Sequence, residues 1–299
     1  MSKTTSWIKA FRLRTLPLAL ASIIMGSLLA IRDGKYSWAV IILATLTTIL
    51  LQVLSNLAND YGDWVKGTDN KGRLGPTRAV QSGEISHEQM KKAVIIFASL
   101  SLLSGLWLLY ASFGNNIGAA LVFFLLGLGA IAAAIKYTVG KKAYGYSGLG
   151  DLFVFVFFGL VGVFGTYYLN TLDFNLEIFL PAISIGLMST GMLNLNNMRD
   201  IDNDILSGKH TLASKLGIHK AKVYHLLLIG VALATASIYV VLNYSSLWNL
   251  LFLITAPLFL NDLVGIFNQQ DQKHLDPYLK KLALATLLFS ILFGVGMML

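Results

Sequence analysis

Residues 38–58 read WAVIILATLTTILLQVLSNLA, and residues 59–63, NDYGD, follow without a break. The first stretch holds 21 residues and no charge, which is the length that an α-helix needs to cross the hydrocarbon core of a bilayer. The second stretch carries Asp60 and Asp63, which lie one turn apart if the helix continues. A membrane-spanning helix that ends in carboxylates is the unit from which we predict the fold.

The composition of the whole chain is that of an integral membrane protein. Its 299 residues are 56% hydrophobic and only 13% charged, about half the charged fraction of a soluble domain. Long apolar runs exclude a soluble α/β enzyme and a disordered chain. Without cysteine, disulfides, zinc–thiolate sites and a cysteine nucleophile are excluded. We interpret the net charge of +8 as a sign of membrane topology, not of nucleic-acid binding.

Nine segments are long and apolar enough to span a membrane. They are Thr15–Ile31, Trp38–Ala58, Ala93–Phe113, Ile117–Tyr137, Leu149–Leu169, Ile178–Met198, Ala221–Asn243, Leu247–Phe267 and Tyr278–Leu299. Arg14-Thr-Leu-Pro17 is a plausible helix start, and no cleavage site favours reading the first segment as a signal peptide. We therefore predict an all-α bundle of nine transmembrane helices that forms a single domain, residues 1–299.

The basic residues predict the orientation of this bundle. If the N-terminus is cytoplasmic, 21 of the 23 Lys and Arg residues lie in inner segments, and only Arg32 and Lys35 lie outside. Positive charge concentrates on the cytoplasmic side of membrane proteins. The Asp-rich loops after the second and sixth spans are then also cytoplasmic, so we expect the chemistry on that face.

The sixth span ends in a second polar motif that matches the first. Residues 194–204 read NLNNMRDIDND, and both motifs begin Asn-Leu-X-Asn before their carboxylates. Three- and four-residue steps place side chains on one helix face, so Asn197, Asp200 and Asp204 share a face, as do Asn56, Asn59, Asp60 and Asp63. The two motifs lie four spans apart, which indicates a weak internal repeat.

Crowded carboxylates at a bilayer surface repel one another unless a cation lies between them. Oxygen ligands without nearby His or Cys favour Mg²⁺ or Ca²⁺ over zinc. Basic residues in the same loops are suited to clamp a diphosphate: Lys66, Lys71, Arg73, Arg78, Lys141, Lys142, Arg199 and Lys209. The alternative for the acids is that they are solvated loop charges, and for the bases that they only set topology.

With these motifs the sequence resembles the UbiA-type intramembrane aromatic prenyltransferases, and within them the branch that prenylates 1,4-dihydroxy-2-naphthoate. The resemblance covers nearly the whole chain. It rests on Arg14-Thr-Leu-Pro-Leu, Ser55-Asn-Leu-Ala-Asn-Asp-Tyr-Gly-Asp63, Lys66-Gly-Thr-Asp69, Gly75-Pro-Thr-Arg78, Tyr137-Thr-Val-Gly, Tyr144-Gly-Tyr-Ser-Gly-Leu-Gly-Asp151 and Asn194–Asp204 with Gly208-Lys209.

The resemblance implies a set of site residues. It implies two Mg²⁺ ions, bridged by the substrate diphosphate and bound by Asn59, Asp60, Asp63, Asp69, Asp200 and Asp204. Four of these acids (Asp60, Asp63, Asp200 and Asp204) and Arg78 are the expected catalytic residues. The substrates are expected to contact Asn56, Asn59, Lys66, Arg78, Tyr137, Lys142, Asp151, Asn197 and Lys209. Asp262, inside the eighth span, is a further candidate because intramembrane acids are rare, and His210 is assigned no role.

The resemblance also implies the reaction. A polyprenyl group passes from polyprenyl diphosphate to 1,4-dihydroxy-2-naphthoate, with loss of diphosphate and CO₂, giving demethylmenaquinol in menaquinone biosynthesis at the bacterial cytoplasmic (inner) membrane. The expected partners are these two substrates and membrane lipid. One alternative is a prenyltransferase with another aromatic acceptor. The other is a cation-coupled transporter, which predicts carboxylates near the bilayer midplane and helices broken there.

Overall fold

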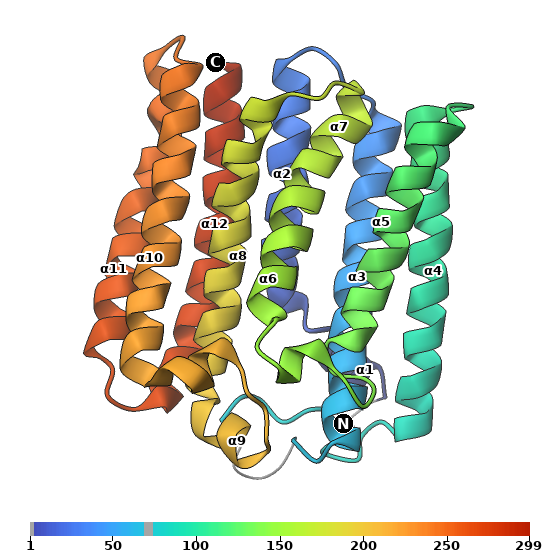
Figure 1. Ribbon diagram of the computed structural model, residues 1–299, viewed down its shortest axis with the longest axis vertical. Coiled ribbons are helices and arrows are strands. Elements are labelled where there is room, and N and C mark those ends of the chain that lie inside the picture. Colours follow the sequence, from blue (N-terminus) through green and yellow to red (C-terminus); the bar gives the residue numbers. More distant parts are fainter. Residues whose placement is uncertain (1–2, 69–73) are drawn as a thin grey trace.

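The chain folds into a bundle of long helices that run side by side (Figure 1). The structure is a computed structural model that describes residues 3–68 and 74–299. Within this part of the chain, nine helical segments are long and apolar enough to cross a membrane. The prediction of an all-α protein with nine spans is confirmed.

The spans follow one another with bounds close to those predicted. They are α2 (Leu16–Arg32), α3 (Trp38–Val65), α4 (His87–Phe113), α5 (Ile117–Lys136), a fifth span of α6 (Gly150–Val154), a π-helical segment (Phe155–Phe164) and α7 (Gly165–Thr171), then α8 (Phe179–Arg199), α10 (Leu212–Leu242), an eighth span of a 3₁₀ segment (Leu247–Thr255) and α11 (Ala256–Asn268), and α12 (Asp276–Met298). Two short helices, α1 (Lys3–Phe11) and α9 (Ile201–Leu206), precede α2 and follow α8.

At the end that carries the polar motifs, several helices extend beyond the predicted spans. Helix α3 continues to Val65, past the predicted end at Ala58. Helix α10 begins at Leu212, before the predicted Ala221, and breaks at Gly217, whose φ is 75°. A left-handed residue, Arg12 (φ 49°), separates α1 from the first span. Hydropathy finds only the part of a helix inside the bilayer, whereas backbone hydrogen bonds continue into the polar region beyond it.

The two halves of the bundle differ in packing. Helices α2, α8, α10 and α12 share the largest apolar core, built around side chains such as Met188, Tyr239 and Phe293. Helix α5 lies at the other side of the bundle in Figure 1 and buries only Ala133. Large apolar side chains on α4 and α5, among them Trp107 and Ile117, are exposed, as expected where lipid is the solvent.

One end of the bundle gathers the polar motifs. In Figure 1 the N-terminus, α1 and α9 lie together at the lower end, and the C-terminus lies at the upper end. The carboxyl ends of α3 and α8 reach the same lower end, so the two Asp-rich motifs lie at one end of the bundle (Figure 1). This arrangement positions the site described next.

Candidate active site

The first motif lies on the last turns of α3 and is buried despite its charge. Asp60 and Asp63 are 1% and 3% exposed, which is unfavourable for a carboxylate without a partner. The helix continues through this motif, so the two side chains lie on one face, as predicted. Close packing holds the helix there: a Cβ at Gly62 would lie 2.5 Å from Oγ1 of Thr138, whose hydroxyl donates to the carbonyl of Ala58 at 3.0 Å.

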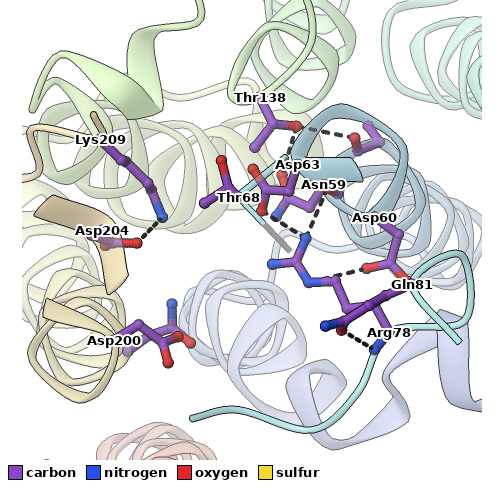
Figure 2. A network of polar contacts seen from close by, with 12 residues as sticks. Asn59, Asp60, Asp63, Thr68, Arg78, Gln81, Thr138, Asp200, Asp204 and Lys209 are labelled. Carbon is purple, nitrogen blue, oxygen red and sulfur yellow. Dashed lines mark hydrogen bonds and ion pairs between the residues drawn. The ribbon is translucent and has the colours of Figure 1, made fainter. Parts of the chain in front are cut away.

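Two arginines pair with these acids. Nη1 of Arg78 lies 2.6 Å from Oδ2 of Asp63, and its Nε lies 3.7 Å from Oδ1 of Asp60. Arg78 also donates to the backbone carbonyl of Asn59 at 2.8 Å, as Figure 2 shows. Arg12, at the break between α1 and α2, forms an ion pair with Asp60. A left-handed backbone is uncommon outside glycine and is often found at functional sites.

The second motif follows the end of α8. Asp200 connects α8 to α9, and α9 turns Asp204 inward and Asp202 outward: Asp200 and Asp204 are 4% and 2% exposed, whereas Asp202 is exposed. Asp200 accepts from the fully buried Arg199 at 2.6 Å, and Lys209 Nζ lies 3.4 Å from Asp204. Burial raises the pKa of Asp204 to about 6 although Lys209 opposes the shift.

Tyr146 and Asn203 connect the two motifs. The hydroxyl of Tyr146 donates to Asp63 at 2.7 Å and accepts from Thr68 at 2.5 Å, and burial raises the pKa of Tyr146, which keeps this donor protonated. Asn203, on α9, donates to the carbonyl of Thr68 at 3.1 Å. The segment after α3 is therefore bonded to both acidic motifs. In Figure 2, Asp200 and Asp204 lie across a gap from Asp63 and Arg78.

A large cavity opens at the first motif and extends through the bundle. Its volume is about 950 Å³, at the upper end of the range for small-molecule sites. Its polar mouth is lined by Asn59, Asp60, Asp63, Arg78, Asn196 and Lys209, and its far part by apolar side chains of α2 to α5 and of the fifth span. Tyr137 and Tyr144, in edge-to-face contact, lie on its wall between these regions.

The oxygen atoms at this site are of the kind that binds a divalent cation, although the described residues do not form a complete set of metal ligands. Among residues 3–68 and 74–299, no three acidic or imidazole side chains converge closely enough to hold a metal ion, because each acid is paired with a basic side chain. Three buried oxygens of the second motif, Oδ1 of Asn194, Oδ1 of Asn197 and Oδ2 of Asp204, have no hydrogen-bond partner in this part of the chain. Unpartnered buried oxygens are rare, and such oxygens are the ligands that Mg²⁺ prefers.

The structure brings most of the predicted site residues together and leaves others apart. Asn56 lines the cavity and anchors the N-terminal segment by donating to the carbonyl of Phe11 at 2.9 Å. Lys66 lies beside the site with Nζ 3.7 Å from the ring centre of Tyr146. Lys142 is exposed and outside the cavity lining.

Two further acids lie away from the cavity, and one lies outside the described residues. Asp151 does not line the cavity and accepts from Tyr224 of α10 at 3.4 Å. Asp262 lies 3.8 Å from Lys281, between α11 and α12. Asp69 is not among the described residues.

Sequence reasoning did not select Arg12, Tyr146 or Asn203 as site residues. Arg12 was counted only as a topology signal. Arg199 was predicted to clamp a diphosphate, whereas the structure pairs it with Asp200 and Asp276. Tyr146 lies in the stretch Tyr144–Asp151, which carries part of the family resemblance, and this position was the signal that could have identified it. Nothing in the local sequence of Asn203 indicates its contact with Thr68, 135 positions away.

Comparisons with known proteins agree with this fold. The sequence model described as the UbiA prenyltransferase family matches residues 19–296. A 1,4-dihydroxy-2-naphthoate octaprenyltransferase of Haemophilus influenzae is 45% identical over 298 residues, which are 99% of this chain and 96% of the relative. The enzyme of that name from Escherichia coli is 42% identical and covers 100% of this chain and 97% of its own.

Solved structures share the fold at lower identity. The apo structure of a UbiA homolog from Aeropyrum pernix K1 superposes with a TM-score of 0.67 at 18% identity, covering 96% of this chain and 97% of that one. A UbiA homolog from Archaeoglobus fulgidus bound to GPP and Mg²⁺ gives a TM-score of 0.57 at 17% identity, covering 94% of this chain and 99% of that one.

Proposed function

This chain belongs to the UbiA prenyltransferase family, and from that premise we propose that it transfers a polyprenyl group from polyprenyl diphosphate to 1,4-dihydroxy-2-naphthoate. The relatives at 42% and 45% identity bear the name of that activity over nearly their full length. The reaction releases diphosphate and CO₂ and gives demethylmenaquinol, a step of menaquinone biosynthesis.

One observation carries the proposal: the buried acids Asp60 and Asp63 lie at the mouth of an apolar cavity, and the second acid pair, Asp200 and Asp204, lies across a gap from Asp63 (Figure 2). Arg78 and Lys209 line this mouth, and their positive charges suit the oxygens of a diphosphate. Asp60, Asp63, Asp200 and Asp204, with Asn59 and Asn197, are the residues that would hold Mg²⁺. Two ions fit two acid pairs, and Mg²⁺ in complex with a diphosphate commonly takes only one or two carboxylates. Bound there, Mg²⁺ would neutralise negative charge on the departing diphosphate.

The chain's own residues favour departure of the diphosphate and protect the resulting allylic cation from water. The allylic C–O bond breaks, and its electron pair leaves with the diphosphate toward Arg78 and Lys209. The resulting allylic cation lies in an apolar cavity, which keeps water from capturing it. The rings of Tyr137 and Tyr144 border the cavity just inside the mouth and present π electrons to a cation.

The aromatic acceptor completes the reaction at the same cavity. Its ring carbon that bears the carboxylate forms the new C–C bond, and the carboxylate leaves as CO₂, returning its bonding electron pair to the ring. Tyr144 stacks on Phe153 with ring centres 4.0 Å apart, so the inner wall offers flat aromatic surfaces beside the mouth. The acceptor's own carboxylate and hydroxyls are suited to the polar mouth, where Arg78 lies.

We place the protein in the bacterial cytoplasmic membrane with the acidic motifs on the cytoplasmic side. Nine apolar spans support a multi-pass membrane protein. The excess of Lys and Arg at the end that carries both motifs supports their cytoplasmic location. The N-terminus then lies on the same side, since it is found at that end of the bundle (Figure 1).

Prenyl transfer fits the site better than cation-coupled transport does. A transporter of that type binds its ion near the bilayer midplane, between broken helices, whereas these carboxylates lie at helix ends. Another aromatic acceptor remains the closer rival, because the acid pairs bind the donor and not the ring. The acceptor is therefore what the experiment has to identify.

The proposal is tested with purified protein, Mg²⁺, octaprenyl diphosphate and 1,4-dihydroxy-2-naphthoate. We expect diphosphate and CO₂ in equal amounts together with the prenylated naphthalene. Product from 4-hydroxybenzoate instead would identify the other acceptor class. Absence of diphosphate release with every acceptor would reject prenyl transfer. Asp202→Asn is the matched control for substitutions of the buried acids, because Asp202 is exposed on the same short helix.

A further inference from the structure

A second cavity lies beside the first. It lies between α5 and the fifth span, has a volume of about 350 Å³, and is lined almost entirely by apolar groups. Three residues, Phe123, Leu126 and Val161, line both cavities. The two spaces therefore lie next to each other at these three residues.

The fifth span has an unusual conformation along this wall. Its residues Phe155–Phe164 form a π-helical segment of 10 residues, and π-helical turns are rare and are frequently found at functional sites. Glycines fix one side of the segment: a Cβ at Gly159 would lie 2.5 Å from the carbonyl oxygen of Ala182, and one at Gly162 would lie 2.8 Å from Cβ of Ser22.

With its glycine side held against α2 and α8, the segment presents bulky residues to the cavities. Phe157, Phe158 and Val161 line the first cavity, and Leu160, Val161 and Phe164 line the second. The π-helical segment therefore borders both cavities along its length.

Phe123, which lines both cavities, is held in place by aromatic contacts. Its ring stacks on Tyr168 with ring centres 5.4 Å apart and planes inclined by 10°. A Cβ at Gly165 would lie 3.6 Å from the edge of the same ring, so the ring fits against the bare backbone there. Phe113 touches it from α4, with ring centres 5.4 Å apart.

The position of Phe123 along α5 can be compared with the length of a prenyl chain. Phe123 precedes Tyr137, near the mouth, by 14 positions, which is about 21 Å along a helix. An extended chain advances roughly 1.2 Å per bond, so a four-bond isoprene unit covers about 5 Å. A geranyl chain of about 10 Å then ends before Phe123, whereas an octaprenyl chain of about 40 Å continues past it.

We propose that the second cavity receives the distal isoprene units of the donor, and that Phe123, Leu126 and Val161 set the chain length that the enzyme prefers. This inference rests on the proposed prenyl transfer and adds its donor specificity. The occupant is an isoprenoid chain because the second cavity shares three lining residues with the cavity that opens at the diphosphate site, and Tyr168 supplies the only hydroxyl in its lining.

The test compares two donors, geranyl diphosphate and octaprenyl diphosphate, with the same acceptor and Mg²⁺. Ala119→Phe adds a ring to the second cavity, because Ala119 lines that cavity and not the first. We expect the ratio of kcat/KM for octaprenyl over geranyl diphosphate to fall at least about tenfold, as when a few methylene groups lose their pocket. Phe123→Ala removes a ring that lines both cavities and should raise the same ratio.

Leu121→Phe is the matched control, since Leu121 lies on the same helix, is exposed, and lines neither cavity. The control should keep the wild-type ratio. An unchanged ratio in Ala119→Phe would overturn the inference while leaving prenyl transfer intact. If the wild type transfers neither donor, the proposed function fails and the inference fails with it. If Ala119→Phe does not fold, judged by thermal unfolding, Val122→Trp fills the same cavity from an exposed position and must lower the ratio.

Discussion

Substituting Asp204 by Asn tests whether the second acidic motif binds metal and diphosphate. The change preserves shape and removes one negative charge from a side chain that is 2% exposed. Its Oδ2 has no hydrogen-bond partner within the described residues, so a ligand, and not packing, is the expected reason for the acid. Asp202→Asn makes the same chemical change two positions away, on the exposed side of α9.

The magnitude follows from the linkage between binding and stability. A ligand at a hundred times its dissociation constant stabilises a protein by about 2.7 kcal/mol. If losing one carboxylate raises that constant about a hundredfold, the same concentration stabilises the variant by only about 0.4 kcal/mol. At roughly 2–4 °C per kcal/mol, the shift in melting temperature falls from about 5–10 °C to about 1–2 °C.

The assay is thermal unfolding of purified protein in detergent, with and without Mg²⁺ and inorganic diphosphate. For each variant, the melting temperature with ligand is compared with the melting temperature of the same variant without ligand. This is necessary because Asp204→Asn also leaves the buried Lys209 without its partner and lowers the stability of the unliganded protein. Prenyl transfer should fall about 10²–10³-fold in Asp204→Asn and stay near wild type in Asp202→Asn. A full ligand-induced shift in Asp204→Asn, or equal losses in both variants, would refute the assignment.

Three further variants test the rest of the site. Arg78→Lys keeps the charge but loses the planar, two-pronged donor, so transfer should fall at least about tenfold while the protein stays folded; wild-type kinetics would exclude a direct role of the guanidinium. Tyr146→Phe removes one hydrogen-bond donor to the first motif. A Mg²⁺ titration should show that the Mg²⁺ concentration for half-maximal rate rises about tenfold. An unchanged concentration would make the hydroxyl a packing contact only. Gly62→Ala places a methyl 2.5 Å from Thr138 and should cost about 1–3 kcal/mol of stability, whereas Gly230→Ala, with open space around it, should not destabilise the protein. Equal melting temperatures for the two glycine variants would contradict the close contact between Gly62 on α3 and Thr138, which follows α5.

The spans and the acid faces were predictable because their signals are local. Bilayer thickness fixes how long an apolar run has to be, and helix geometry fixes which residues of Asn56–Asp63 share a face. The exposure of Asp202 beside buried Asp204 follows from the same geometry. The ends of α3 and α10 were less predictable, because a helix does not end where the hydrocarbon ends.

The partners of the acids were not predictable from local sequence. Tyr146 reaches Asp63 across 83 positions and Arg12 reaches Asp60 across 48, so only the packing of the helices shows these contacts. From the sequence, we predicted that the acids bind metal and that the basic residues bind diphosphate. The structure pairs them with one another, since a buried charge without a bound ion needs an opposite charge. The second cavity has no sequence signal either, because it arises from the π-helical segment beside α5.

A structure of the protein with Mg²⁺ and geranyl thiodiphosphate, a donor analogue that resists ionisation, tests the central claim most directly. The account predicts metal density between the carboxylates of α3 and those that follow α8, with Arg78 and Lys209 turned from Asp63 and Asp204 to the diphosphate. Arg78 and Lys209 still paired with those acids, and the diphosphate bound elsewhere without metal, would contradict it.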